Sequence, residues 1–194
     1  MMRYVFCFLL FAILLFPLFF SSSAFATGVA AGQDEMPRLE LTIPDIPEHQ
    51  DYLGVQGSPG DSFTVEDIDA DILLIELFSM YCPFCQEEAP YVNELYEMMQ
   101  ALPADGPRVK IIGLGAGNSA FEVDHFRSTY DVEFPLFPDK DLSMYKALSG
   151  AGTPGFIGVK KTAEDGFVIV LRQSGGFHDK ESFLEQLLTS GAKE

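Results

Sequence analysis

The feature that most restricts the fold of this chain is an apolar run followed by two cysteines and a long amphipathic segment. The run covers residues 72–78 and is interrupted by one acid, Glu76. Such a run predicts a strand that is covered on both faces of a sheet. Between residues 83 and 100, apolar side chains recur at steps of three and four, which predicts a helix with one buried face. Cys82 and Cys85 therefore stand where a buried strand passes into a helix.

Hydrophobic periodicity predicts further elements along the chain. Strands and helices alternate through its middle, which is typical of an α/β sheet with parallel neighbours and crossover helices. Two later strands, at 156–160 and 167–172, flank a turn-rich segment and predict an antiparallel hairpin. We expect Phe121, Phe126 and Tyr130 on the buried side of one helix. The remaining predicted elements are an edge strand at 38–43, strands at 63–65, 109–114 and 134–137, and helices at 119–130, 142–148 and 180–188, the last capped by Asp179.

The beginning of the chain differs from the rest in composition. A single charge, Arg3, precedes an apolar run at residues 4–20, and small residues then lead to Ala24-Phe25-Ala26. This order is typical of a secretory signal peptide, so we expect cleavage after Ala26 and export to the periplasm or an equivalent compartment. The alternative is an uncleaved segment that anchors the protein, because the apolar run approaches the length that spans a bilayer.

The expected organisation is a signal peptide at 1–26, an N-terminal extension with an edge strand at 27–57, and one domain at 58–194. The whole chain of 194 residues carries a formal net charge of −17. An acidic surface repels nucleic acid and anionic membranes, and it keeps a protein soluble. We therefore expect a monomer without a nucleic-acid partner.

Cysteine use points to redox chemistry. Cys7 lies in the expected signal peptide, so the exported chain would keep only Cys82 and Cys85, spaced C-x-x-C. A single pair of nearby cysteines cannot form a framework of structural disulfides. The pair is therefore more consistent with a redox-active disulfide. At a helix N-terminus, free backbone N–H groups and the helix dipole stabilise a thiolate. We expect Cys82 to attack a partner disulfide and Cys85, one turn later and turned inward, to resolve the mixed disulfide. Pro83 stiffens the first turn without removing a hydrogen bond.

Glu76 interrupts the apolar strand six residues before Cys82. Burial of a carboxyl group raises its pKa, so Glu76 is a candidate to exchange a proton with Cys85. The alternative is an acid at a strand end that reaches solvent or a lysine.

Other uses of the cysteine pair need additional ligands. A zinc site needs two more, and the histidines at 49, 125 and 178 are scattered singly. Attachment of c-type haem needs a histidine after the second cysteine, where this chain has Gln86. We expect no metal and no cofactor besides the Cys82–Cys85 disulfide, with an inert structural bridge as one alternative. A rival from another class is a copper or zinc carrier, or a chaperone, that uses the two sulfurs as ligands.

These residues resemble the thioredoxin superfamily, which carries an acid six residues before the first cysteine and a proline five residues after the second. Glu76, the run Tyr81-Cys82-Pro83-Phe84-Cys85 and Pro90 match those spacings. The resemblance implies an α/β, thioredoxin-like fold with a central mixed sheet and helices on both faces. It also implies a cis-proline beside the reactive sulfur, and Thr153-Pro154 is similar to that motif.

The same resemblance implies how a partner protein binds. The backbone of Thr153, beside Pro154, would pair with an extended partner segment. Tyr81, Pro83 and Phe84, which surround the first cysteine, would contact the partner; Tyr81 stands where the superfamily usually has Trp.

The strand at Ile111, the helix from Ser119 and the segment 134–139 resemble the strand-helix insertion of exported TlpA-like thiol-disulfide oxidoreductases. This resemblance implies protein thiols and disulfides as partners, a reductant role and a membrane protein as candidate electron donor. The active-site run is also similar to that of glutaredoxins, but the length and the insertion disagree with that family. A peroxiredoxin would need Pro and Thr where this chain has Ile75 and Ser79.

Overall fold

The computed structural model describes residues 35–164, 166–177 and 179–190. The expected signal peptide at 1–26, and with it the question of cleavage or anchoring, lies outside the described residues. The strands are β1 (Glu40–Thr42), β2 (Ser62–Thr64), β3 (Ile72–Phe78), β4 (Val109–Ala116), β5 (Leu136–Asp139), β6 (Gly155–Lys161) and β7 (Phe167–Ser174). The helices are α1 (Pro47–Leu53), α2 (Pro83–Gln100), α3 (Ala120–Thr129), α4 (Ser143–Ala147) and α5 (Lys180–Thr189), with a 3₁₀ turn at Val65–Asp67.

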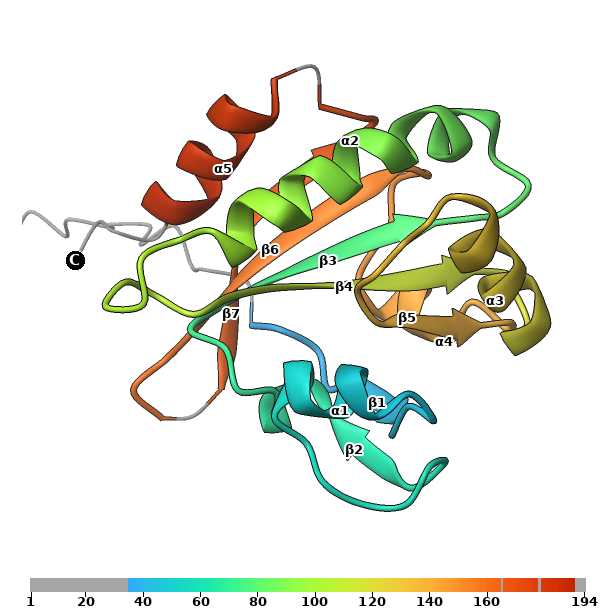
Figure 1. Ribbon diagram of the computed structural model, residues 1–194, viewed down its shortest axis with the longest axis horizontal. Coiled ribbons are helices and arrows are strands. Elements are labelled where there is room, and N and C mark those ends of the chain that lie inside the picture. Colours follow the sequence, from blue (N-terminus) through green and yellow to red (C-terminus); the bar gives the residue numbers. More distant parts are fainter. Residues whose placement is uncertain (1–34, 165, 178, 191–194) are drawn as a thin grey trace, which may run out of the picture. The chain divides into compact units, whose positions relative to one another are not determined.

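The main sheet has five strands in the order β5-β4-β3-β6-β7 (Figure 1). β4 pairs in parallel with both β3 and β5, whereas β6 pairs antiparallel with β3 and with β7. The sheet is therefore mixed, as the expected fold class requires. β3 occupies its centre, and all seven of its residues are buried.

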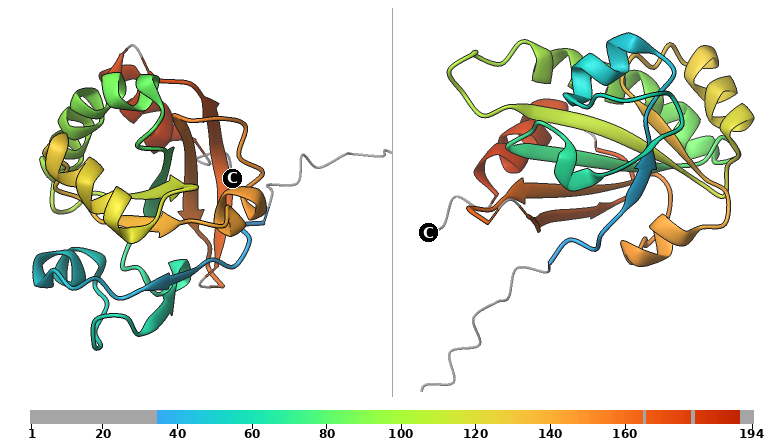
Figure 2. Two further views of the ribbon diagram at one scale, coloured as in Figure 1. Left: turned by 90° about the vertical axis from the view of Figure 1, so that its right-hand side faces the viewer. Right: turned by 90° about the horizontal axis from the view of Figure 1, so that it is seen from below.

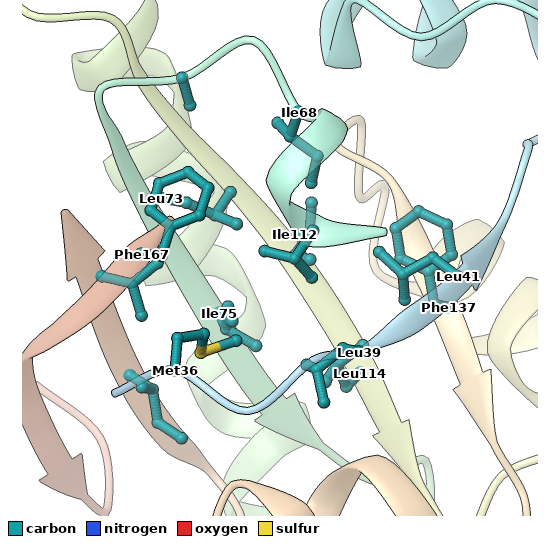
Figure 3. Packing of buried hydrophobic residues seen from close by; sticks show 14 of the residues in the cluster. Met36, Leu39, Leu41, Ile68, Leu73, Ile75, Ile112, Leu114, Phe137 and Phe167 are labelled. Atoms are coloured by element: carbon teal, nitrogen blue, oxygen red, sulfur yellow. The ribbon is translucent and has the colours of Figure 1, made fainter. Parts of the chain in front are cut away.

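Helices α2, α3 and α5 cover one face of the main sheet, and the small β1–β2 sheet with α1 and α4 covers the other (Figure 2). Because side chains alternate along a strand, β3 contributes to two cores. Leu73 and Ile75 belong to the same buried cluster as Leu39 and Leu41, which come from β1 and its approach. In Figure 3 this cluster extends across the sheet, with Leu73 beside Phe167, Leu39 beside Leu114 and Leu41 beside Phe137. On the other face Leu74 and its alternate neighbours pack with the buried sides of α2, α3 and α5.

Several sequence-based predictions are confirmed at residue level. β3 and α2 have the predicted limits, and β6 and β7 form the predicted hairpin. Asp179 caps α5, since its carboxylate accepts the Ser182 backbone N–H at 2.9 Å. The predicted helix from Ser119 is α3, and it begins with a reciprocal capping box of Ser119 and Glu122 that was not predicted.

The N-terminal part of the described chain differs from the prediction. β1 is a strand, but it pairs antiparallel with β2 in a separate two-stranded sheet and does not extend the main one. The sequence reading also missed α1, a helix with proline at its first position that ends at Gly54 in the left-handed conformation (φ 76°). Pro47 suits the first position of α1, because the N–H that it lacks would have no acceptor within the helix.

Two smaller predictions are wrong. β5 begins at Leu136, two residues later than predicted. Phe121 is 79% exposed, whereas Val123 and Phe126 form the buried side of α3. Phe121 precedes Phe126 by five residues, which places it about 140° around a helix of 3.6 residues per turn.

Candidate active site

Cys82 is the N-cap residue of α2, and Pro83 occupies the first helical position. The Cys82 N–H donates to the Ser79 carbonyl at 3.0 Å, and the Cys82 carbonyl accepts from the Cys85 N–H at 3.1 Å. This turn connects the carboxyl end of β3 to α2 and leaves the Cys82 side chain partly exposed. Cys82 thus lies at the helix terminus where the sequence predicts it.

Two opposing effects act on the pKa of Cys82. Partial burial raises it, but hydrogen bonds to the sulfur outweigh that effect and the pKa is lowered from its ordinary value. The hydrogen bonds come from the Thr153 side chain, the Cys85 thiol and the backbone N–H groups of Cys85 and Phe84. Both backbone donors belong to the first turn of α2, where N–H groups lack the acceptor four residues earlier that they would have inside a helix, and the Cys85 N–H also bonds the Cys82 carbonyl. Cys82 is therefore the thiol more readily ionised near neutral pH.

Cys85 has the opposite environment. It is fully buried in the core beneath α2. Burial, its hydrogen bond to the Cys82 sulfur and the nearby negative charges of Cys82 and Glu76 raise its pKa, despite a hydrogen bond from the Ser79 backbone. Cys85 therefore remains a neutral thiol while Cys82 ionises.

Glu76 lies in the middle of β3, opposite Gly113 of β4 and Phe156 of β6. It alternates with Leu74 and Phe78, so it faces the same core as Cys85. It is 2% exposed, and its Oε1 atom makes no hydrogen bond with any described residue. Burial, reinforced by the charge of Glu88, raises the pKa of Glu76 to about 8. The alternative of a solvent-reaching strand-end acid is excluded by this burial.

Glu88 is a second carboxyl group at this site, and the sequence reading missed it. It stands three residues after Cys85 on α2, one turn along the same helix. Its carboxylate accepts the Phe177 N–H at 2.8 Å, and a Cβ at Gly176 would overlap it. The spacing from Cys85 was visible in the sequence, but the contact with Gly176 and Phe177 depends on the tertiary fold.

The segment before Pro154 lies against the reactive sulfur. The Thr153–Pro154 peptide bond is cis, in agreement with the resemblance, and the Cys82 thiol donates to the Thr153 carbonyl at 3.1 Å. Tyr81 and Phe84 are exposed on either side of Cys82, at 67% and 69%. Pro83 is exposed as well. All five residues expected to contact a partner, Tyr81, Pro83, Phe84, Thr153 and Pro154, therefore lie around or beside Cys82.

The backbone of Met80, two residues before Cys82, is held at both ends. Its N–H donates to Oδ1 of Asn118 at 2.8 Å, and its carbonyl accepts from Nε2 of Gln86 at 2.7 Å. Asn118 is fully buried and also donates to the Ser79 hydroxyl at 3.3 Å. The sequence reading missed both side chains. Asn118 follows β4, the parallel neighbour of β3, and carboxyl ends of parallel strands meet at one edge of a sheet.

We expect Asn118→Ala to loosen the turn that carries Cys82. The Met80 N–H loses its acceptor, which lowers the free energy of unfolding by about 1–3 kcal/mol. The pH midpoint of Cys82 alkylation rises toward that of an unconstrained cysteine, because the helix-terminal donors no longer hold the sulfur in place. Urea unfolding and alkylation rates across pH measure the two effects.

Asn93→Ala is the matched control. Asn93 also donates to backbone carbonyls, of Tyr130 and Asp131, but it lies about 16 Å further along α2. This variant should lose stability without a change in the Cys82 profile. If both variants leave that profile unchanged, Asn118 does not position the cysteine.

The described residues contain no group of three or more His, Cys, Asp or Glu side chains placed to hold a metal ion. His49 is buried and its Nε2 lies 3.0 Å from the Glu133 carbonyl oxygen, while His125 is in α3. His178 lies outside the described residues.

Comparisons with known proteins assign the chain to a family and a fold. Residues 33–172 match the model of the AhpC/TSA family. The thiol-disulfide oxidoreductase ResA of Halalkalibacterium halodurans is 26% identical over 128 residues, covering 65% of this chain and 68% of that protein. ResA of Bacillus thuringiensis subsp. konkukian is 28% identical over 128 residues, covering 66% and 68%.

Solved structures share the fold. The thioredoxin domain of a thiol-disulfide oxidoreductase from Bacteroides vulgatus superposes with a TM-score of 0.59 and 16% identity, covering 80% of this chain and 96% of that domain. StoA from Bacillus subtilis gives a TM-score of 0.51 and 20% identity, with 66% and 89% covered. The chain belongs to the AhpC/TSA family, and it is a TlpA-like thiol-disulfide oxidoreductase with a thioredoxin-like fold.

Proposed function

We propose that this protein is exported and reduces disulfides in partner proteins through Cys82 and Cys85. The observation that carries the proposal is the contrast between the two thiols: Cys82 is partly exposed with a lowered pKa, and Cys85 is buried with a raised one. A nucleophile must reach its partner as a thiolate, and a resolving thiol must stay protonated until the mixed disulfide forms.

The reaction has two exchange steps. The Cys82 thiolate attacks one sulfur of a partner disulfide, forms a mixed disulfide and releases the other partner sulfur as a thiolate, which takes up a proton. Cys85 then loses its proton and attacks the Cys82 sulfur, releasing the second partner thiolate. The partner gains two electrons and the protein keeps a Cys82–Cys85 disulfide. A dithiol donor, for which a membrane protein is our candidate, must reduce that disulfide before the next cycle.

Glu76 would exchange the Cys85 proton. Its pKa of about 8 lies within roughly one unit of neutral pH, so both its protonated and ionised forms are accessible. Two observations support this role: Glu76 faces the core that contains Cys85, and its charge contributes to the raised pKa of Cys85. The ionised form can accept the proton as Cys85 attacks, and the neutral form can return it when a donor opens the disulfide.

The test uses insulin as a protein disulfide substrate. Reduced, metal-free protein with dithiothreitol as the regenerating dithiol should reduce an excess of insulin in repeated turnovers. Cys85→Ala, reduced beforehand and freed of dithiothreitol, should stop at the first step and accumulate a covalent complex with insulin, because no thiol is then present to resolve the mixed disulfide. Mass spectrometry should locate the link at Cys82.

Absence of turnover in the wild type together with absence of trapping by Cys85→Ala would refute the proposal. Stoichiometric binding of Cu(I) or Zn(II) by the same preparation would then favour the carrier alternative. A redox titration against glutathione tests the reductant role separately, since a reductant requires a potential below that of its partners.

Export is part of the proposal because it rests on the sequence of residues 1–26. None of the helices in the described part of the chain has both the length and the apolar character needed to cross a bilayer. Expression of the full chain with a C-terminal tag, followed by fractionation and N-terminal sequencing, distinguishes cleavage after Ala26 from an uncleaved anchor.

A further inference from the structure

A groove of about 820 Å³ lies beside the reactive cysteine. One wall is a face of α2, and the other is formed by residues 152–154 and 174–176. Thr153, whose carbonyl oxygen contacts the Cys82 thiol, belongs to the second wall. A partner segment joined to Cys82 by a disulfide therefore has the groove next to it.

The α2 wall has an ordered chemistry. Phe84, Glu87, Glu88 and Tyr91 follow one another at steps of three, one and three residues, which places all four on one side of the helix. The two aromatic rings are 69% and 53% exposed, and Glu87 is exposed between them. Along this wall, aromatic rings flank two carboxyl groups.

The opposite wall adds no positive charge and little bulk. Its members are Gly152, Thr153, Pro154, Ser174, Gly175 and Gly176, so Glu87 and Glu88 are the charged residues among those that line the groove. The described partners of Glu88 include the Phe177 backbone N–H, an uncharged donor. The groove therefore combines negative charge, aromatic faces and accessible backbone beside the sulfur.

We propose that this groove selects partner segments that carry an arginine close to the cysteine of the disulfide being attacked. The inference rests on the proposed disulfide exchange and specifies its substrates. A guanidinium group bonds a carboxylate with two parallel N–H groups and stacks on an aromatic ring, so it satisfies both features of the α2 wall. A lysine ammonium satisfies the charge but not the planar stacking.

The geometry also sets the position of that arginine. Glu87 and Glu88 follow Cys82 by five and six residues of helix, which is about 8 Å along the axis. An extended partner segment advances about 3.3 Å per residue. The arginine should therefore stand two or three residues from the reacting cysteine.

Symmetric disulfide dimers of short peptides test this inference, because attack on either sulfur leaves the same peptide on Cys82. The peptides share a central cysteine and carry Arg, Lys, Gln or Glu two or three residues from it, on either side. The rate constant of mixed-disulfide formation is measured with the Cys85→Ala protein by mass spectrometry. We expect the Arg peptide to react roughly three- to tenfold faster than the Gln peptide, with Lys between them and Glu slowest.

The chain has a net charge of −17, which by itself attracts any positively charged peptide. Two controls distinguish that general attraction from binding of the arginine in the groove. A peptide with its arginine six residues from the cysteine has the same charge but should react like the Gln peptide. Glu87→Gln should lower the Arg-to-Gln rate ratio about threefold, whereas Glu97→Gln, an exposed site ten residues further along α2, should leave it unchanged. The preference should also weaken in about 1 M salt, where screening shortens to about 3 Å.

Equal rates for all peptides, or equal effects of the Glu87 and Glu97 substitutions, would overturn the inference while leaving disulfide exchange intact. Failure of every peptide to form a mixed disulfide would instead count against the proposed function itself.

Discussion

Cys82→Ser lowers the rate of insulin reduction by about 10³-fold or more, down to the rate of dithiothreitol alone. A serine hydroxyl remains protonated where the Cys82 sulfur, held by the donors of the first turn of α2, ionises. Turnover is measured by the precipitation of reduced insulin chains. Cys85→Ser should also lose turnover, but it should still form the mixed disulfide.

Alkylation of the reduced wild-type protein gives an independent measure of the same difference. At neutral pH, iodoacetamide should label Cys82 and leave the buried Cys85 unmodified, with the site located by fragmentation of the peptide that contains both. The pH midpoint for Cys82 should lie below that of the same residue in the urea-unfolded chain, because its pKa is lowered in the fold. Equal midpoints in the two states would remove the basis for Cys82 as nucleophile.

Glu76→Gln should stabilise the protein increasingly as the pH rises. The pKa of Glu76 is about 8 in the folded chain against an ordinary value of 4.5, so unfolding releases its proton between these two pH values. The stability of the wild type consequently falls as pH rises through that window, and the variant lacks this loss. The difference in free energy of unfolding between variant and wild type should grow by an amount on the order of 4 kcal/mol between pH 4.5 and pH 8.5. Urea titrations at several pH values measure it.

Glu97→Gln is the matched control for that experiment. It removes one carboxylate from an exposed position of α2, and its stability should parallel the wild type across the pH range. The same two variants also test proton exchange. The rate constant with which Cys85 resolves the mixed disulfide should fall by about 10²-fold in Glu76→Gln and should not change in Glu97→Gln. A pH-independent stability difference would show that Glu76 ionises normally in the folded protein.

The two carboxyl groups near Cys85 differ in origin. Glu76 comes from the central strand β3 and lies in the core, while Glu88 comes from α2 and binds the Phe177 backbone. The charge of Glu88 contributes to the raised pKa of Glu76, so the protonation of one depends on the other. In Glu88→Gln, the upper limit of the pH window of the stability loss should therefore fall, while the lower limit, set by the unfolded chain, stays near 4.5. Urea titrations at several pH values measure this limit.

Features that depend on residues close together in the chain could be predicted from the amino-acid sequence. The limits of β3 and α2 could be predicted from the pattern of apolar residues. The position of Cys82 at the N-terminus of α2 follows from the boundary between the two patterns. For Glu76 the sequence favoured burial but left open a strand-end acid that reaches solvent or a lysine, and its 2% exposure in the structure decided between the two.

Contacts around Cys82 and Cys85 between residues far apart in the chain could be identified only from the folded structure. Asn118 follows a neighbouring strand, Gly176 and Phe177 follow the last one, and their contacts with Met80 and Glu88 arise only when the sheet is assembled. The exposure of Phe121, by contrast, follows from its spacing, because five residues of helix place it about 140° from Phe126. Periodicity in a sequence indicates which side of a helix or strand is apolar. Hydrogen bonds between segments far apart in the chain depend instead on strand order and register. Strand order and register are established only when the cores on both faces of β3 pack together.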